Sequence, residues 1–391
     1  MSRGSSNPSG HVARIPRIAD ELPRCPDYSG ACVTNVVPSL LGPGGTDDLP
    51  SFFPDVVRGA RQVVLLVIDG LGWHQLRDRI DNSPRVTATL ASMSGSSITT
   101  IAPTTTVTAL TSITTGAAPG EHGLVGYRID FSGRVVQMLR WADEGGDVRR
   151  RLTPRDVQPC PPFLGSRVPV LSKAEFDGTA FTESHLRDQR MFSWRAMSSM
   201  VVDVRSLLAR GERFVYCYYD GIDKIAHERG FGDHYDAELL TVDRLIADIA
   251  TVLPRDAVLL ITADHGQVMV GEHTMPLAPA VTQLLTHQSG EGRFRWLHVA
   301  GGRVDDVVAA ARSHHGDVAW VMTRDEMIDQ GYFGRRVNDV VRRRLGDVAV
   351  MAKHEVSFDD PADKTYFSLQ CRHGSLTSAE VDVPLLAVGA R

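Results

Sequence analysis

Continuous apolar runs at three places in the chain predict buried β-strands. The runs span residues 63–68, 214–219 and 257–263, and they read VVLLVI, FVYCYY and AVLLITA. An uninterrupted run of this kind is typical of a parallel strand that is covered on both faces. Between the second and third runs, residues 236–253 repeat apolar positions at helical spacing. This alternation of strand and helix predicts an α/β fold with a doubly wound, mostly parallel sheet.

The remaining segments divide the chain into a core and additions to it. Residues 1–25 are polar and contain Ser, Gly and Pro, which predicts a disordered leader. Residues 130–200 show an irregular pattern with clustered prolines, and we interpret them as a lid-like elaboration. A further strand at 97–102 precedes a Thr-rich stretch, and strands at 367–371 and 383–388 are expected to rejoin the sheet. The catalytic core is therefore predicted to comprise residues 26–273 and 362–391.

Residues 274–361 have a different pattern from the core. Short strands and helices alternate there, and we expect strands at 294–299 and 318–322 with helices at 304–313 and 338–345. This order predicts a compact α+β subdomain inserted into the core.

Composition and charge exclude some classes of function. The 42 Lys and Arg residues nearly balance 47 Asp and Glu, and the formal charge of -5 gives no general attraction to a nucleic-acid polymer or an anionic membrane. The five cysteines have no metal-type spacing. No apolar run approaches the roughly 20 residues of a membrane span, and the N-terminus lacks a secretory signal. These features predict a cytoplasmic protein.

Acidic and histidine residues follow the predicted strands. Open α/β sheets bind ligands at the carboxyl ends of their strands. A lone Asp there is usually a turn residue, and an Asp/His pair four residues apart is usually a surface pair, but their conjunction favours a site. Carboxylates and imidazoles suit Zn²⁺ or a related divalent ion, and six such ligands are too many for one tetrahedral ion. The candidates are Asp69, Asp223, His227, Asp264, His265 and His373.

A Thr-rich stretch at residues 101–127 supplies a candidate nucleophile. Pro103 disfavours helix in the residue before it, and Thr is an accepted N-cap, so a helix should begin near Thr105 or Thr106. A hydroxyl at such a junction faces free N–H groups that favour an anion, but it needs a base or a metal for activation.

Five motifs in order resemble the alkaline phosphatase superfamily, and within it the type I phosphodiesterase/nucleotide pyrophosphatase family. They are VIDGLG, PTTTVTALTSITTG with a following HG, DGIDKIAHERG, TADHG and a late HG. The resemblance covers about residues 60–130, 210–270 and 365–390. It leaves out the additions to the core.

The resemblance implies a role for each candidate. Thr106 matches the nucleophile, which also binds metal, and the ligands of the ion that activates it are implied to be Asp69, Asp264 and His265. The second ion is implied to be bound by Asp223, His227 and His373, with His354 as a competing candidate for the last ligand. The implied cofactors are two divalent ions, with Zn²⁺ favoured and Mn²⁺ as the alternative. Tyr127 stands where the family usually has an Asn that holds a phosphoryl oxygen, and we interpret it as a substrate-binding residue.

These observations together predict a metal-dependent hydrolase that acts on a small phosphate ester. We expect cleavage of a phosphodiester or pyrophosphate through a phospho-threonine intermediate. A phosphomonoesterase or phosphomutase on the same core is the alternative within enzymes. A non-catalytic metal- or phosphate-binding module is the alternative of another class. The sequence identifies no protein partner.

Overall fold

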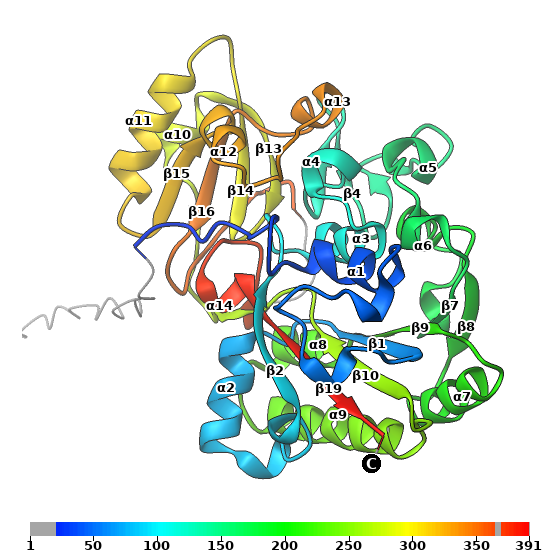
Figure 1. The fold of residues 1–391 in the computed structure, drawn as a ribbon. Coiled ribbons are helices and arrows are strands. Elements are labelled where there is room, and N and C mark those ends of the chain that lie inside the picture. Colours follow the sequence, from blue (N-terminus) through cyan, green and yellow to red (C-terminus); the bar gives the residue numbers. More distant parts are fainter. Residues whose placement is uncertain (1–20, 364–368, 391) are drawn as a thin grey trace, which may run out of the picture.

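The computed structural model describes residues 21–363 and 369–390. Its largest sheet has seven strands and lies between layers of helices (Figure 1). Five neighbouring strands of this sheet run parallel, and the next strand pairs antiparallel both with the last of these five and with the edge strand beyond it. The strand order is β2 (Ser94–Thr99), β19 (Asp382–Gly389), β10 (Ala257–Thr262), β1 (Gln62–Ile68), β9 (Phe214–Tyr219), β7 (Pro169–Lys173) and β8 (Arg190–Trp194). The predicted α/β fold with a mostly parallel sheet is confirmed.

Helices flank this sheet on both sides (Figure 1). One side carries α7 (Ser198–Ala209) and α9 (Asp233–Thr251), and the other carries α1 (Val36–Leu41), α3 (Thr106–Thr115) and α6 (Ala180–Leu186). The remaining helices of this part are α2 (Trp73–Asn82), α4 (Pro119–His122), α5 (Pro154–Val157), α8 (Gly221–Arg229) and α14 (Ser378–Val381). The apolar face of α9 packs into the main core, as its sequence period predicts.

A second, antiparallel sheet lies in the segment predicted as an insertion. Its order is β13 (Leu285–Glu291), β14 (Phe294–Val299), β16 (Val348–Ala352) and β15 (Ala319–Thr323). Its helices are α10 (Pro279–Thr282), α11 (Val304–His315), α12 (Arg324–Asp329) and α13 (Asp339–Arg342). A separate apolar cluster lies between this sheet and α11. The boundaries 274–361 of a subdomain stay a prediction.

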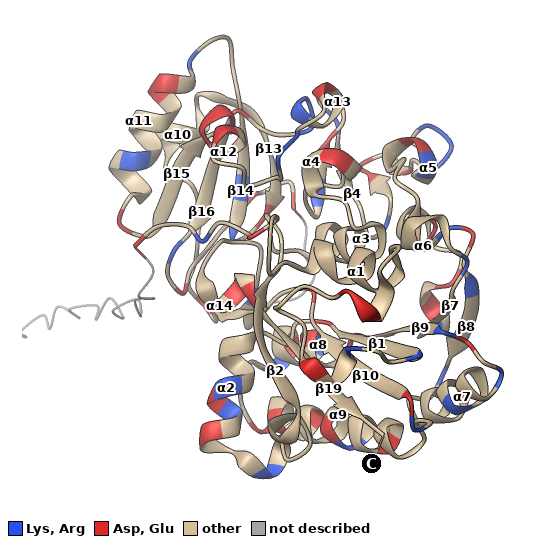
Figure 2. Cartoon of the chain, in the orientation of Figure 1, with Lys and Arg blue, Asp and Glu red and all other residues tan. Residues whose placement is uncertain are grey.

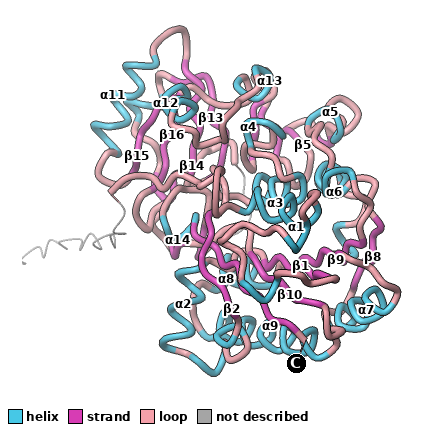
Figure 3. Tube along the Cα trace, in the orientation of Figure 1, coloured by secondary structure: helices cyan, strands magenta, loops and turns pink. Residues whose placement is uncertain are grey.

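Small sheets and loops connect the two large sheets (Figure 3). A small four-stranded sheet contains β3 (Arg128–Asp130), β4 (Val135–Gln137), β5 (Ala142–Asp143) and β6 (Gly146–Asp147). Two further sheets have two strands each: β11 (Val268–Met269) pairs with β18 (Cys371–Arg372), and β12 (Thr274–Met275) pairs with β17 (Ser357–Phe358). Acidic and basic residues are interspersed over the elements (Figure 2). Among the described residues, no helix is both long and apolar enough to cross a membrane.

The structure differs from the sequence predictions at two places, and a further prediction falls largely outside the described residues. Within the stretch predicted as lid-like, β7 and β8 extend the main sheet. The sequence predicts a short strand at 167–171, which overlaps β7, but not its pairing with the main sheet, and the sequence RMFSW of β8 shows no clear strand period. The strand predicted at 367–371 lies partly outside the described residues, and its described end, β18, pairs with β11 rather than the main sheet. The predicted leader also lies outside the described residues as far as residue 20.

Candidate metal and nucleophile site

Three buried residues meet at the carboxyl ends of two adjacent parallel strands. Asp69 follows β1, and Asp264 and His265 follow β10, with Val67 of β1 paired to Thr262 of β10. The Nε2 atom of His265 lies 3.5 Å from Oδ1 of Asp69 and 3.4 Å from Oδ2 of Asp264. The register of the parallel pair therefore brings these side chains together, as the sequence predicts.

The carboxylates of this group retain unpaired oxygens. Oδ1 of Asp69 and Oδ2 of Asp264 are buried and have no hydrogen-bond partner among the described residues. Burial raises the pKa of Asp69 well above its usual value, and the charges of Asp264 and Asp223 add to that rise. Clustered buried carboxylates are costly unless a cation or hydrogen bonds compensate them. The donor set and its two orphan oxygens fit a divalent cation beside His265.

A second group forms where α8 meets the loop after β18. Asp223 and His227 lie one helical turn apart, and Oδ1 of Asp223 is 3.3 Å from Nε2 of His227 and 3.9 Å from Nε2 of His373. Nε2 of Gln267 also donates to Oδ1 of Asp223 at 2.8 Å. His354 lies in the loop after β16. Of the two candidate ligands, His373 and not His354 shares a potential metal-binding cluster with Asp223 among the described residues, and the third member of that cluster is His265 rather than His227.

All three imidazoles are oriented by backbone carbonyls. Nδ1 of His227 lies 2.7 Å from the carbonyl of Cys371, Nδ1 of His265 lies 3.1 Å from that of Gly266, and Nδ1 of His373 lies 2.8 Å from that of Thr104. Because a carbonyl oxygen only accepts, each Nδ1 carries the proton and each Nε2 keeps its lone pair toward the carboxylates. Burial lowers the pKa of His265 and of His373, which keeps both rings neutral near pH 7. This is the arrangement that metal-binding histidines adopt.

Thr106 is the first residue of α3, and its hydroxyl points at the first group. Thr105 is the N-cap in an extended conformation, so the predicted helix start is confirmed. Oγ1 of Thr106 lies 3.1 Å from Nε2 of His265. The hydroxyl thus sits at a helix N-terminus and beside the candidate ion, where both favour an incoming anion.

The hydroxyl of Tyr127 lies near the start of β3, where Gln137 of β4 donates a hydrogen bond to it. Burial raises the pKa of this phenol to about 12, so it stays protonated. Since Gln137 uses the oxygen as an acceptor, the phenolic proton is left to donate elsewhere. Among the described residues no hydrogen bond joins Tyr127 to the two ligand groups.

A cavity of about 220 Å³ opens beside Thr106 and Asp69. Its walls combine apolar and aromatic side chains with a few charged ones. The apolar and aromatic members include Leu110, Leu139, Phe176, Phe181, Leu186 and Tyr216. Lys224 and the buried Asp220 also line the cavity and form an ion pair at 2.6 Å. The cavity can therefore hold an organic group next to the candidate nucleophile.

Sequence reasoning missed several residues that support the site. The hydroxyl of Tyr218 donates to Oδ2 of Asp69, and Gln267 holds Asp223. Both residues belong to or adjoin motifs that were recognised, since Tyr218 is the fifth residue of the FVYCYY run and Gln267 follows Asp264-His265-Gly266. That position is the only sequence signal either residue gives. The cavity walls come largely from residues 172–186, whose irregular pattern gave none.

Comparisons with known proteins identify the family and the fold of this chain. Residues 63–376 match the family described as type I phosphodiesterase / nucleotide pyrophosphatase. A search of curated proteins finds no match. The solved structure of murine ectonucleotide pyrophosphatase/phosphodiesterase 5 is similar, with a TM-score of 0.62 and 15% identity over 84% of this chain and 88% of that one. A phosphonoacetate hydrolase from Sinorhizobium meliloti 1021, in complex with phosphonoformate, gives a TM-score of 0.61 and 16% identity over 84% and 90%.

Proposed function

Because the chain belongs to the type I phosphodiesterase / nucleotide pyrophosphatase family, a family of metal-dependent hydrolases, we propose that it cleaves phosphodiester or pyrophosphate bonds with Thr106 as nucleophile. The observation that carries the proposal is the convergence of Thr106 and six potential ligands at one edge of the main sheet. We propose Zn²⁺ as the bound metal and Mn²⁺ as the alternative, since both ions accept carboxylate and imidazole donors.

The orientation of the rings supports two ions with separate ligand sets. The rings of His265 and His373 stack at 3.7 Å with only 17° between their planes. The donor atoms of Asp223, His265 and His373 lie within 4.8 Å of one another. A histidine binds metal in its ring plane, however, and nearly parallel planes converge poorly on one point, so we assign these two rings to different ions. The rings of His227 and His373 are inclined by 43° and can converge. We therefore assign Asp69, Asp264 and His265 to one ion and Asp223, His227 and His373 to the other.

Two bound divalent ions would supply charge stabilisation for the entering and leaving oxygens of an in-line displacement. In the proposed reaction, Oγ1 of Thr106 loses its proton and forms a bond to phosphorus. The bond from phosphorus to the leaving oxygen breaks, and the leaving group takes up the proton. The resulting phospho-threonine is then hydrolysed by water, which breaks the bond between phosphorus and Oγ1 and restores the hydroxyl. The free N–H groups at the start of α3 face the phosphoryl oxygens throughout. Tyr127 is proposed to donate a hydrogen bond from its phenolic hydroxyl to one of those oxygens.

The cavity beside Thr106 favours a diester over a monoester. A diester carries an organic substituent on phosphorus besides its leaving group, whereas a monoester carries the leaving group alone. We propose that the enclosure of about 220 Å³ accepts this additional substituent. Similar solved structures are described with AMP and with phosphonoacetate, which are small phosphorus-containing ligands. We propose a substrate of that size class for this chain.

Turnover of bis(p-nitrophenyl) phosphate and of p-nitrophenyl phosphate tests the proposal on protein loaded with Zn²⁺ or Mn²⁺ and on chelated protein. We expect metal-dependent turnover that prefers the diester. A preference for the monoester would assign the protein to the phosphatase or mutase alternative. No turnover of either compound by protein with two bound ions would contradict the proposed chemistry and favour a non-catalytic binding module.

A further inference from the structure

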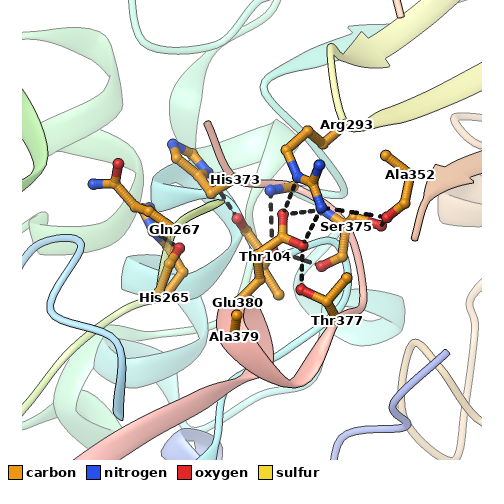
Figure 4. A network of polar contacts seen from close by, with 12 residues as sticks. Thr104, His265, Gln267, Arg293, Ala352, His373, Ser375, Thr377, Ala379 and Glu380 are labelled. Atoms are coloured by element: carbon orange, nitrogen blue, oxygen red, sulfur yellow. Dashed lines mark hydrogen bonds and ion pairs between the residues drawn. The ribbon is translucent and has the colours of Figure 1, made fainter. Parts of the chain in front are cut away.

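A fully buried ion pair joins the second sheet to the loop that carries His373. Arg293 lies in the turn between β13 and β14, and Glu380 lies in α14; both side chains have 0% exposure. Nε of Arg293 donates to Oε1 of Glu380 at 2.8 Å, and Nη2 donates to Oε2 at 2.8 Å (Figure 4). The pair is therefore bidentate, which fixes both its distance and its direction.

The other donors of Arg293 are also used. Nη1 donates to the backbone carbonyls of His354 and Val356, both at 2.7 Å, and Nη2 makes a longer contact of 3.3 Å with that of Ala352. These carbonyls lie at the end of β16 and in the loop after it. The guanidinium thus ties the second sheet to Glu380 without leaving a charge unpaired, which is the condition under which a buried pair is tolerated.

Glu380 in turn fixes the polypeptide that follows His373. Its Oε1 accepts from the backbone N–H of Ser375 at 3.0 Å, and its Oε2 accepts from the hydroxyl of Thr377 at 2.6 Å. Four hydrogen bonds to one carboxylate leave this loop little freedom.

The fixed loop holds both His373 and the residues that precede the nucleophile. The carbonyl of Ser375 accepts from the hydroxyl of Thr104 at 2.8 Å, and the same hydroxyl accepts from the N–H of Gly374 at 3.0 Å. The carbonyl of Thr104 orients Nδ1 of His373 at 2.8 Å. Thr104 stands two residues before Thr106, so one network reaches a proposed metal ligand and the approach to the proposed nucleophile (Figure 4).

The same short helix contacts the other ligand group. The backbone carbonyl of Glu380 accepts from the N–H of Gly266 at 2.9 Å. A Cβ atom on Gly266 would lie only 2.1 Å from the carbonyl oxygen of Ala379, so the two backbones approach closely. Gly266 directly follows His265. Helix α14 therefore contacts the loop of His265 through its backbone and the loop of His373 through the side chain of Glu380.

We propose that Arg293 and Glu380 are positioning residues that set the separation between the two ligand groups, an inference that rests on the proposed function. The pair makes the β13–β14 hairpin part of the support for the second ion, and this gives the segment 274–361 a role in catalysis. Loss of the pair should release His373 more than His265, because His265 is also fixed within the ends of β1 and β10.

The test compares Glu380→Gln with the wild-type protein in Zn²⁺ titrations against a chromophoric chelator, with metal content measured by mass spectrometry. We expect one of the two ions to bind at least tenfold more weakly and the other to change less than threefold, since loss of outer-shell partners costs roughly 10- to 100-fold in affinity. At saturating Zn²⁺, kcat for bis(p-nitrophenyl) phosphate should fall about tenfold with KM within twofold. Glu212→Gln is the matched control, because Glu212 forms a bidentate pair with Arg190 at the far edge of the main sheet.

A folded Glu380→Gln protein that binds both ions with wild-type affinity and keeps its kcat would overturn the inference. If that variant does not fold, Thr377→Val removes a single hydrogen bond to the carboxylate, and unchanged ion binding in it overturns the inference equally. Wild-type protein with two ions but no phosphoester turnover would refute the proposed function alone, and the ion affinities of the variants would still decide the role of the pair. Wild-type protein that binds no ions would refute both.

Discussion

Replacing Gly70 by Ala tests how closely the two ligand groups are packed. Gly70 follows Asp69 and has φ of +73°, a left-handed conformation that costs an L-residue roughly 1–2 kcal/mol. An added Cβ would lie 2.4 Å from Nε2 of Gln267 and 3.0 Å from both Cα and Cβ of Asp223. Relief of such overlap costs about 1–3 kcal/mol more, because the backbone of Asp223 must move. We therefore expect Gly70→Ala to lower the free energy of unfolding by about 2–5 kcal/mol.

The functional effect follows from the same contacts. Gln267 donates to Asp223 at 2.8 Å, so displacement of either side chain disturbs the second ligand group. Binding of the second ion should weaken by roughly 10- to 100-fold. Gly211→Ala is the control, because Gly211 has φ of +84° and open space around the added Cβ.

Urea unfolding and Zn²⁺ titration of both variants provide the measurement. In Gly211→Ala the free energy of unfolding should fall only by the conformational cost of about 1–2 kcal/mol, and both ions should bind normally. Equal losses of stability in the two variants, or normal ion binding by Gly70→Ala, would refute the reasoning.

Three further predictions concern the first ligand group, the cavity and the response to acid. Tyr218→Phe removes the hydroxyl that donates to Asp69, and Zn²⁺ titration should show about tenfold weaker binding of one ion. Phe181→Ala enlarges the cavity, so KM should rise about tenfold for bis(p-nitrophenyl) phosphate and little for p-nitrophenyl phosphate; equal changes would contradict the assignment of the cavity. Burial lowers the pKa of His185 to about 4, below the unfolded value near 6.5, so the unfolded state binds more protons between these pH values. For chelated protein, the contribution of His185 to the free energy of unfolding should be fully present above pH 6.5 and should fall by about 3 kcal/mol as the pH is lowered to 4. Urea unfolding should show a smaller fall for the His185→Gln variant.

The elements that sequence reasoning located best are those whose own residues determine them. The run 214–219 is buried on both faces, and the predicted limits match β9 because an apolar sequence and a central parallel strand go together. The start of α3 was predicted from Pro103 and the Thr residues after it, which act locally. Strand-end acids then indicated the site, because parallel strands bring their carboxyl ends to one edge.

The features that were missed depend on partners far away in the chain. Strand β13 reads LTHQSGE, which has no apolar period, and it is defined by its pairing with β14. Arg293 and Glu380 are 87 residues apart, and neither has a local sequence signal for the other. Both cases are set by tertiary packing, which a single sequence does not display.

Turnover of bis(p-nitrophenyl) phosphate by wild-type protein and by Thr106→Ala, matched for metal content, tests the central claim most directly. The hydroxyl is proposed to form the covalent intermediate, so we predict a loss of at least about 10³-fold in kcat with two ions still bound. Acid quenching of the wild-type reaction should also trap a p-nitrophenyl phosphoryl group on Oγ1 of Thr106. Full turnover by Thr106→Ala with both ions present would contradict the account.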